Sequence, residues 1–439
     1  MLRETSVKNG RLRGVPGNDP RVTVYKGIPF GAPPVGENRW KAPKPCKDWE
    51  GVLDASRFAP ISIQDQPAMG DDIYCREWHV DKDIPMDEDC LYLNVWTPAN
   101  TTEDRLPVLV WYFGGAFQWG YTPEMEFNGE RLARRGIIVV SINYRLGVLG
   151  FLAHPELTAE DSKAPSNFGL LDQKLGLRWV YDNISSFGGD PDNITIAGQS
   201  AGGGSVLHHI TDEDNFGIIR GAAIISGFIR IEGDDILRHI SLREAEEKGT
   251  RFFEFLGVNS LEEARGLDAL YIRDKYAQWA DTGHPRFSPI DDNATYKEDP
   301  YELFCENRKA DIPIIAGYTA DETIADIEGI VGQSVHNAIG AALSAGSHGR
   351  HYIYEFDPDI PGYDDPGAFH SVDLWFWFET LNMCWRPFRG HHYDLARVMC
   401  NYLAGFVKNH DPNGIDDDGS VMPQWNPAGQ DDHNTIRFI

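Results

Sequence analysis

Short, continuous hydrophobic segments recur along the chain and predict the buried strands of a parallel sheet. Most of them end at a glycine, an asparagine or another turn-forming residue, and they occupy residues 107–113, 136–143, 193–197, 221–226, 311–317 and 350–356. Strands that are apolar on both faces are typical of a parallel sheet covered by helices. Two shorter β-type segments, 21–25 and 91–96, lie within a first hundred residues rich in glycine and proline.

Segments with helical character lie between and after these strands. They occupy residues 168–183, 201–210, 242–256, 261–270 and 393–407. In the first segment, Leu171, Leu175 and Val180 fall near one face, as in a helix with one buried side. Strands that alternate with helices indicate an α/β class, and no shift in composition marks a boundary. We therefore predict a single domain over residues 1–439 with a mostly parallel central sheet covered by helices.

The charge of the chain narrows the choice of partners. There are 67 acidic against 40 basic residues, a formal net charge of −27, and 41% of the residues are hydrophobic. This content of apolar residues excludes a disordered acidic tail. A polyanion repels phosphate, so we expect no nucleic-acid partner and no anionic membrane surface. No apolar run approaches the ~20 residues of a membrane span, and the first residues lack the apolar core of a signal peptide. We therefore expect a cytoplasmic protein.

The six cysteines show neither a Cys-x-x-Cys pair nor another metal-ligand spacing. We expect no metal and no other cofactor. Free thiols are the default interpretation, and Cys75 with Cys90 is the one pair that deserves a test as a disulfide.

A candidate nucleophile follows the third hydrophobic strand. Residues 198–202 read Gly-Gln-Ser-Ala-Gly, between the strand and a predicted helix. In such a turn the central serine, Ser200, is lifted out of the sheet, and the flanking glycines avoid a clash with the helix. The backbone N–H of Ala201 then points to where an oxyanion would form.

The longer stretch 187–202, Phe-Gly-Gly-Asp-Pro-Asp-Asn-Ile-Thr-Ile-Ala-Gly-Gln-Ser-Ala-Gly, resembles the serine signature of the type-B carboxylesterase/cholinesterase family. Residues 88–98, Glu-Asp-Cys-Leu-Tyr-Leu-Asn-Val-Trp-Thr-Pro, resemble its second signature. The resemblance implies an α/β-hydrolase fold, with shortened helical insertions in this chain, and serine esterase chemistry. It also implies two buried ion pairs, Arg39 with Glu88 and Arg145 with Asp172.

The glycine turn after the first strong strand is the candidate oxyanion hole. Glycines there let the backbone approach a substrate carbonyl. The family pattern implies that Gly115 and Ala116 donate N–H groups together with Ala201. Two residues depart from that pattern, because Phe113 stands where His or Tyr is usual and Ala116 replaces a third glycine.

In α/β-hydrolases the serine, the acid and the histidine follow one another in this order along the chain. The resemblance implies Glu322 as the acid, with Asp321 as the alternative. His370 resembles the histidine of the family motif, whereas His391–His392 and His208–His209 are alternatives expected to face solvent and to pack on the sheet. Ser226 resembles a serine that supports the acid–base pair.

The substrate class is less constrained by the sequence. Phe117, Trp119 and Gln199 are the predicted substrate contacts, and the aromatic run 375–378 follows His370. Aromatic walls suit aryl or cinnamoyl esters by stacking. Gln199 stands where cholinesterases have Glu, which argues against a choline-ester site. Two alternative functions stay open, a non-catalytic cholinesterase-like binding protein and an amidase or thioesterase on the same fold.

Overall fold

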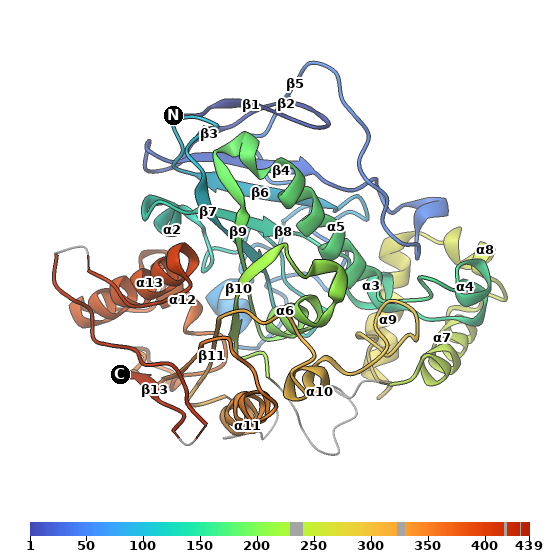
Figure 1. Ribbon diagram of the computed structural model, residues 1–439. Coiled ribbons are helices and arrows are strands. Elements are labelled where there is room, and N and C mark those ends of the chain that lie inside the picture. The colour runs from blue at the N-terminus through green and yellow to red at the C-terminus, as the bar shows by residue number, and fades with distance from the viewer. Residues whose placement is uncertain (229–239, 323–329, 417–418, 431) are drawn as a thin grey trace.

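The computed structural model describes residues 1–228, 240–322, 330–416, 419–430 and 432–439. Its centre is a sheet of ten strands in the order β13-β12-β11-β10-β9-β7-β8-β6-β4-β3, and a small sheet, β1-β2-β5, lies at the N-terminal end (Figure 1). The strands are β1 Glu4–Val7, β2 Gly10–Arg13, β3 Val15–Pro16, β4 Thr23–Pro29, β5 Val52–Asp54, β6 Tyr92–Thr97, β7 Leu106–Tyr112, β8 Ile138–Ile142, β9 Gly189–Gln199, β10 Ile219–Ile225, β11 Ile314–Thr319, β12 His351–Phe356 and β13 Thr435–Phe438.

The large sheet is mostly parallel, which confirms the prediction from the hydrophobic segments. All neighbours from β8 through β7 and β9 to β13 run parallel. The pairs β6–β8, β4–β6 and β3–β4 at the other edge are antiparallel. The six predicted core strands correspond to β7–β12, and the two early segments overlap β4 and β6.

Helices cover both faces of the sheet. They are α1 Tyr74–Glu77, α2 Glu130–Arg134, α3 Gly147–Phe151, α4 Pro155–Glu160, α5 Phe168–Asn183, α6 Ala201–Thr211, α7 Leu242–Leu256, α8 Leu261–Arg265, α9 Ala269–Asp281, α10 Pro300–Cys305, α11 Ile330–Ser344, α12 Leu374–Trp377 and α13 Gly390–Asn409. Helices α5, α6 and α11 contact one face, and α2 and α13 contact the other. None of the described helices is both long enough and apolar enough to cross a membrane.

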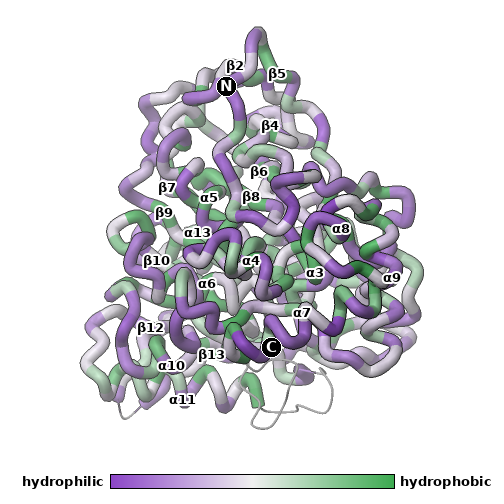
Figure 2. Tube along the Cα trace, turned by 90° about the vertical axis from the view of Figure 1, so that its right-hand side faces the viewer, coloured by the Kyte–Doolittle hydropathy of each residue, from purple (hydrophilic) through white to green (hydrophobic). Residues whose placement is uncertain are grey.

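Helices α4, α7, α8 and α9 form a group beside the sheet (Figure 1). Figure 2 shows both hydrophobic and hydrophilic stretches on this side of the molecule, as expected for helices with one buried face. In α7, Phe252, Phe253 and Leu256 are buried, and the cap Ser241 accepts a hydrogen bond from the N–H of Glu244. This group therefore has its own apolar cluster next to the main core.

The predicted helix 261–270 is divided in the structure, which corrects the sequence prediction. Helix α8 ends at Arg265, and α9 begins at Ala269 and continues to Asp281. The Asp268 carboxylate accepts hydrogen bonds from the N–H groups of Leu270 and Tyr271. An aspartate in this position caps the start of a new helix, and this signal outweighs the apparent periodicity across it.

The two ion pairs implied by the family resemblance are present and buried. Arg39 contacts Glu88 with two hydrogen bonds of 2.6 and 2.7 Å. Asp172 is fully buried, and its carboxylate accepts bonds from the Arg145 guanidinium at 2.6 and 2.7 Å and from the Arg145 N–H at 3.0 Å. Cys75 and Cys90 do not form a disulfide, and the buried Cys90 thiol lies 3.2 Å from the hydroxyl of Ser62.

The Arg145–Asp172 pair yields a stability prediction. Asp172→Asn leaves the Arg145 charge buried without a counter-ion, so we expect the free energy of unfolding in urea to fall by about 3–5 kcal/mol. The matched control is Arg243→Gln, which breaks the exposed pair Arg243–Glu247 and is expected to change stability by less than about 0.5 kcal/mol. Equal losses in both variants would contradict a special role for the buried pair.

Candidate active site

Ser200 occupies a strained turn between β9 and α6. Its backbone has φ 55° and ψ −124°, outside the regions that a serine ordinarily adopts. The Ser200 N–H donates to the carbonyl of Ile225 at the end of β10 (2.9 Å). A Cβ at position 202 would lie 2.7 Å from the Phe113 carbonyl oxygen, and one at position 198 would lie 2.9 Å from that of Tyr112. Gly202 is therefore required where α6 approaches the end of β7, and Gly198 where β9 lies against both Tyr112 and the start of α6.

The structure brings His370 and Glu322 together. The imidazole Nδ1 of His370 is hydrogen-bonded to Oε2 of Glu322, and both side chains are buried. The other carboxylate oxygen accepts from the Ser226 hydroxyl (2.6 Å) and from the Thr319 N–H (3.0 Å). Burial opposes ionisation of Glu322, but His370, Ser226 and Thr319 together lower its pKa below the ordinary value. Glu322 is thus held as a carboxylate that orients the imidazole.

The second imidazole nitrogen makes a contact that the sequence analysis missed. Nε2 of His370 lies 3.0 Å from the amide nitrogen of Gln199. With Nδ1–H donating to Glu322, Nε2 is an acceptor and the Gln199 amide donates to it. Among the described residues, no hydrogen bond joins the Ser200 hydroxyl to His370, although both line one cavity. In the sequence, this contact with His370 is indicated only indirectly, by the position of Gln199 next to Ser200.

Three backbone N–H groups beside the serine are the candidates for the oxyanion hole. Gly115 and Ala116 have φ of 102° and 53°, and within the described structure their N–H groups have no hydrogen-bond partner. Ala201 is the first residue of α6, and the N–H groups of a first helical turn have no partner within the helix. A Cβ on Gly114 would lie 3.1 Å from that of Ser200, so this loop is in close contact with the serine. The arrangement leaves donors available for an oxyanion.

The alternative acid and one pair of alternative histidines have other partners. The Asp321 carboxylate accepts from the N–H of Ala368 (2.7 Å), which holds the loop that carries His370. His391 is exposed, as expected, but His392 is buried and lies 2.8 Å from the carbonyl of Asp359 through Nε2. The expectation that both histidines face solvent is therefore wrong for His392, because the start of α13 packs against the loop at residue 359.

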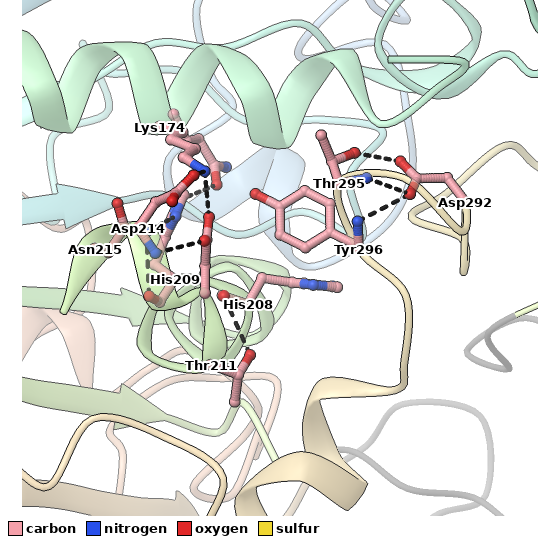
Figure 3. Close-up of polar contacts among 11 residues, drawn as sticks. Lys174, His208, His209, Thr211, Asp214, Asn215, Asp292, Thr295 and Tyr296 are labelled. Atoms are coloured by element: carbon pink, nitrogen blue, oxygen red, sulfur yellow. Dashed lines mark hydrogen bonds and ion pairs between the residues drawn. The ribbon is translucent and has the colours of Figure 1, made fainter. Parts of the chain in front are cut away.

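His208 and His209 lie on α6 in a separate polar cluster (Figure 3). The His209 side chain contacts Gln173, with its Nε2 3.1 Å from Oε1 of that residue. Burial lowers the pKa of His209 to about 3. The His208 ring packs edge-on against Tyr296 at 4.9 Å between centroids. Both side chains are buried against neighbouring elements, in agreement with a structural role.

A cavity of about 510 Å³ extends from Ser200 and His370. Gln199 and Trp119 line it, as do Gly115 and Ala116. Phe117 does not belong to its lining; the Phe117 ring contacts Phe151 at 5.2 Å between centroids. Residues 375–378 are buried in the core.

The cavity also has an acidic and aromatic wall that the sequence analysis missed. The wall consists of Asp65, Asp72, Tyr74, Trp78, His79, Glu124, Glu126 and Phe127. The stretch Glu124-Met125-Glu126, soon after the glycine turn, was the available sequence signal. No described group of three His, Cys, Asp or Glu side chains has the geometry of a metal site.

A serine on a strained strand–helix turn, at the carboxyl end of a central strand of a mostly parallel sheet, defines an α/β-hydrolase. The model of the carboxylesterase family matches residues 3–339. The chain belongs to this family and is a carboxylic ester hydrolase.

Several relatives and solved structures are similar to this chain. Para-nitrobenzyl esterase of Bacillus subtilis is 37% identical over 92% of this chain and 89% of its own. Fumonisin B1 esterase of Sphingopyxis macrogoltabida is 42% identical over 46% of this chain and 35% of its own. A solved structure of PNB esterase has a TM-score of 0.85 and 27% identity, covering 100% of this chain and 96% of the other. A carboxylesterase of Geobacillus stearothermophilus has a TM-score of 0.80 and 28% identity, covering 99% and 96%.

The turn at Ser200 yields a prediction with a control in the same helix. In Gly202→Ala, the new methyl group collides with the carbonyls of β7 and displaces the serine. We expect kcat/KM for p-nitrophenyl acetate to fall at least ~100-fold.

Gly204→Ala is the control, because its Cβ would meet no atom closer than the Phe117 ring at 3.8 Å. We expect this variant to keep its activity and to gain about 0.5–1 kcal/mol of stability. Full activity in Gly202→Ala would show that the close approach of α6 to β7 does not position the serine.

Proposed function

We propose that this carboxylesterase cleaves esters through an acyl-enzyme on Ser200, with His370 as the base and Glu322 as the acid that orients it. The observation that carries the proposal is that His370, which is hydrogen-bonded to Glu322, lines the same cavity as the strained Ser200. The N–H groups of Gly115, Ala116 and Ala201 serve as the oxyanion hole. Ser226 is a positioning residue that acts through Glu322.

In the first half-reaction, Oγ of Ser200 attacks the ester carbonyl carbon while Nε2 of His370 takes the hydroxyl proton. The carbonyl oxygen becomes an oxyanion bound by the three N–H groups. When the C–O bond breaks, the leaving alcohol takes the proton from His370. A water molecule then attacks the acyl carbon while His370 takes its proton, the bond to Oγ of Ser200 breaks, and His370 returns the proton to that oxygen as the carboxylic acid leaves. The Gln199 amide must move away from Nε2 before the first proton transfer.

The proposed substrates are esters with an aromatic acyl or alcohol group, of the aryl or cinnamoyl type. Trp119, Tyr74 and Phe127 on the cavity wall support this proposal, since flat rings stack on aromatic side chains. The name of the similar Bacillus subtilis enzyme, para-nitrobenzyl esterase, also points to an aromatic ester.

The nucleophile is tested with p-nitrophenyl acetate. We expect the unmodified enzyme to turn it over and Ser200→Ala to lose at least ~1,000-fold in kcat, with an unchanged melting temperature. Residual activity close to that of the unmodified enzyme would overturn the assignment of Ser200. An enzyme that cleaves no ester but does cleave anilides or thioesters would favour an amidase or thioesterase. Binding without turnover would favour a non-catalytic protein.

The substrate class is tested with methyl esters, which share one leaving group. We expect methyl cinnamate and methyl ferulate to show kcat/KM at least ~10-fold above methyl octanoate. In Trp119→Leu we expect this preference to shrink, because the stacking surface is lost. A preference for methyl octanoate, or no preference, would refute the aromatic-ester proposal and leave the nucleophile assignment intact.

A further inference from the structure

Glu126 is an unusual residue on the wall of the active-site cavity. Its side chain is fully buried, it contributes to the cavity lining, and it belongs to none of the catalytic groups. Within the described structure, neither carboxylate oxygen has a hydrogen-bond partner of acceptable geometry. A buried carboxyl group without donors is costly, so such a group in a natural structure calls for an explanation, of which a bound ion or ligand is one.

The charged groups around Glu126 leave its carboxyl group without a positively charged partner. Glu77 is paired with the Arg386 guanidinium at 2.7 Å, and Glu124 with the His79 imidazole at 3.2 Å. No described lysine, arginine or histidine forms an ion pair with Glu126. The charged groups that act most strongly on its pKa are the carboxylates of Glu124 and Glu77. A positively charged ligand group could therefore pair with Glu126.

The pKa shifts of Glu126 and His79 agree with this pairing of acidic and basic side chains. Burial, and after it the neighbouring Glu124, raise the pKa of Glu126 well above the ordinary value. Burial disfavours a charged His79, but Glu124 outweighs burial and raises the His79 pKa. A bound cation would offset the cost of burying the charged carboxylate and bring the donors that it lacks.

We propose that Glu126, next to Glu124, forms a subsite that binds a primary ammonium group on the substrate. This inference rests on the proposed function, because it places the ammonium on an ester held at Ser200 in the same cavity. A primary ammonium has three N–H donors, which the oxygens of Glu126 and Glu124 accept. A trimethylammonium group has no N–H donor and leaves these oxygens unsatisfied. The preferred substrates are therefore esters with an amine arm and an aromatic body.

The test compares substrates of equal shape. Methyl 4-(aminomethyl)benzoate is paired with methyl 4-ethylbenzoate, and 4-(aminomethyl)benzyl acetate with 4-ethylbenzyl acetate. The two pairs place the amine on the acyl side and on the alcohol side of the ester. We expect one pair to show kcat/KM at least ~10-fold higher for the ammonium member at pH 7. The corresponding trimethylammonium ester is expected to lose this advantage.

Two variants identify the residue responsible. Glu126→Gln keeps the size of the side chain and removes its charge, and we expect the ammonium-to-ethyl ratio to fall to about 1. Asp72→Asn is the matched control, because Asp72 lines the same cavity at an exposed position. We expect the ratio to remain unchanged in this variant, since solvent screens that carboxylate. Melting temperatures show whether each variant is folded.

The outcomes separate this inference from the proposed function. If the neutral esters are cleaved in a Ser200-dependent manner but the ammonium members have no advantage, the subsite is wrong and the function stands. If Asp72→Asn lowers the ratio as much as Glu126→Gln does, the preference comes from the general negative potential, which also overturns the subsite. If Glu126→Gln does not fold, the unmodified enzyme still decides through the ratio of primary ammonium to trimethylammonium esters. If Ser200→Ala keeps full activity towards the neutral esters, the proposed function fails.

Discussion

The close approach of α6 to β7 is the constraint on which the rest of the active site depends. Gly198 and Gly202 let the helix begin immediately after β9, and Ser200 takes a positive φ as a result. The Ser200 N–H then bonds to Ile225 at the end of β10, and the N–H of Ser226 bonds to Gly317 in β11 (2.8 Å). Because the carboxyl ends of parallel strands meet at one edge of the sheet, these bonds bring three successive loops together. The serine, the carboxylate and the histidine are brought near one another by strand order.

The buried carboxyl groups of this protein differ in the partners that stabilise them. The structural pairs Arg145–Asp172 and Arg386–Glu77 are each closed by a guanidinium, which offers several donors in a fixed plane. Glu322 is stabilised as a carboxylate by His370, Ser226 and a backbone N–H. Glu126 has none of these supports, although it is as deeply buried. This contrast distinguishes a carboxyl group that holds the fold from one that faces a ligand space.

Much of this structure could be predicted from the sequence because the strands are continuous apolar segments. The core strands and the extents of helices α5 and α7 follow from the hydrophobic pattern. The predicted buried face of α5 is only partly right, because Val180 is buried but Leu171 and Leu175 are half-buried. The division of α8 from α9 was missed, because the Asp268 cap lies within an otherwise periodic segment. The contact of Gln199 with His370 joins residues 171 positions apart, and the pairing of Glu77 with Arg386 joins residues 309 positions apart. Such contacts depend on packing, which no local pattern encodes.

The positions of Gln199 and Glu126 both keep a carboxylate away from Nε2 of His370. A carboxylate at position 199 would lie next to Nε2 of His370 and would favour the protonated imidazole, which cannot accept the serine proton. The neutral amide of Gln199 contacts the same atom without this effect. The unpaired carboxyl group of the cavity is that of Glu126, on the acidic and aromatic wall, where a substrate could reach it without a change of charge beside the base. If Glu126 binds an ammonium group as proposed, recognition of charge and proton transfer use different side chains of one cavity.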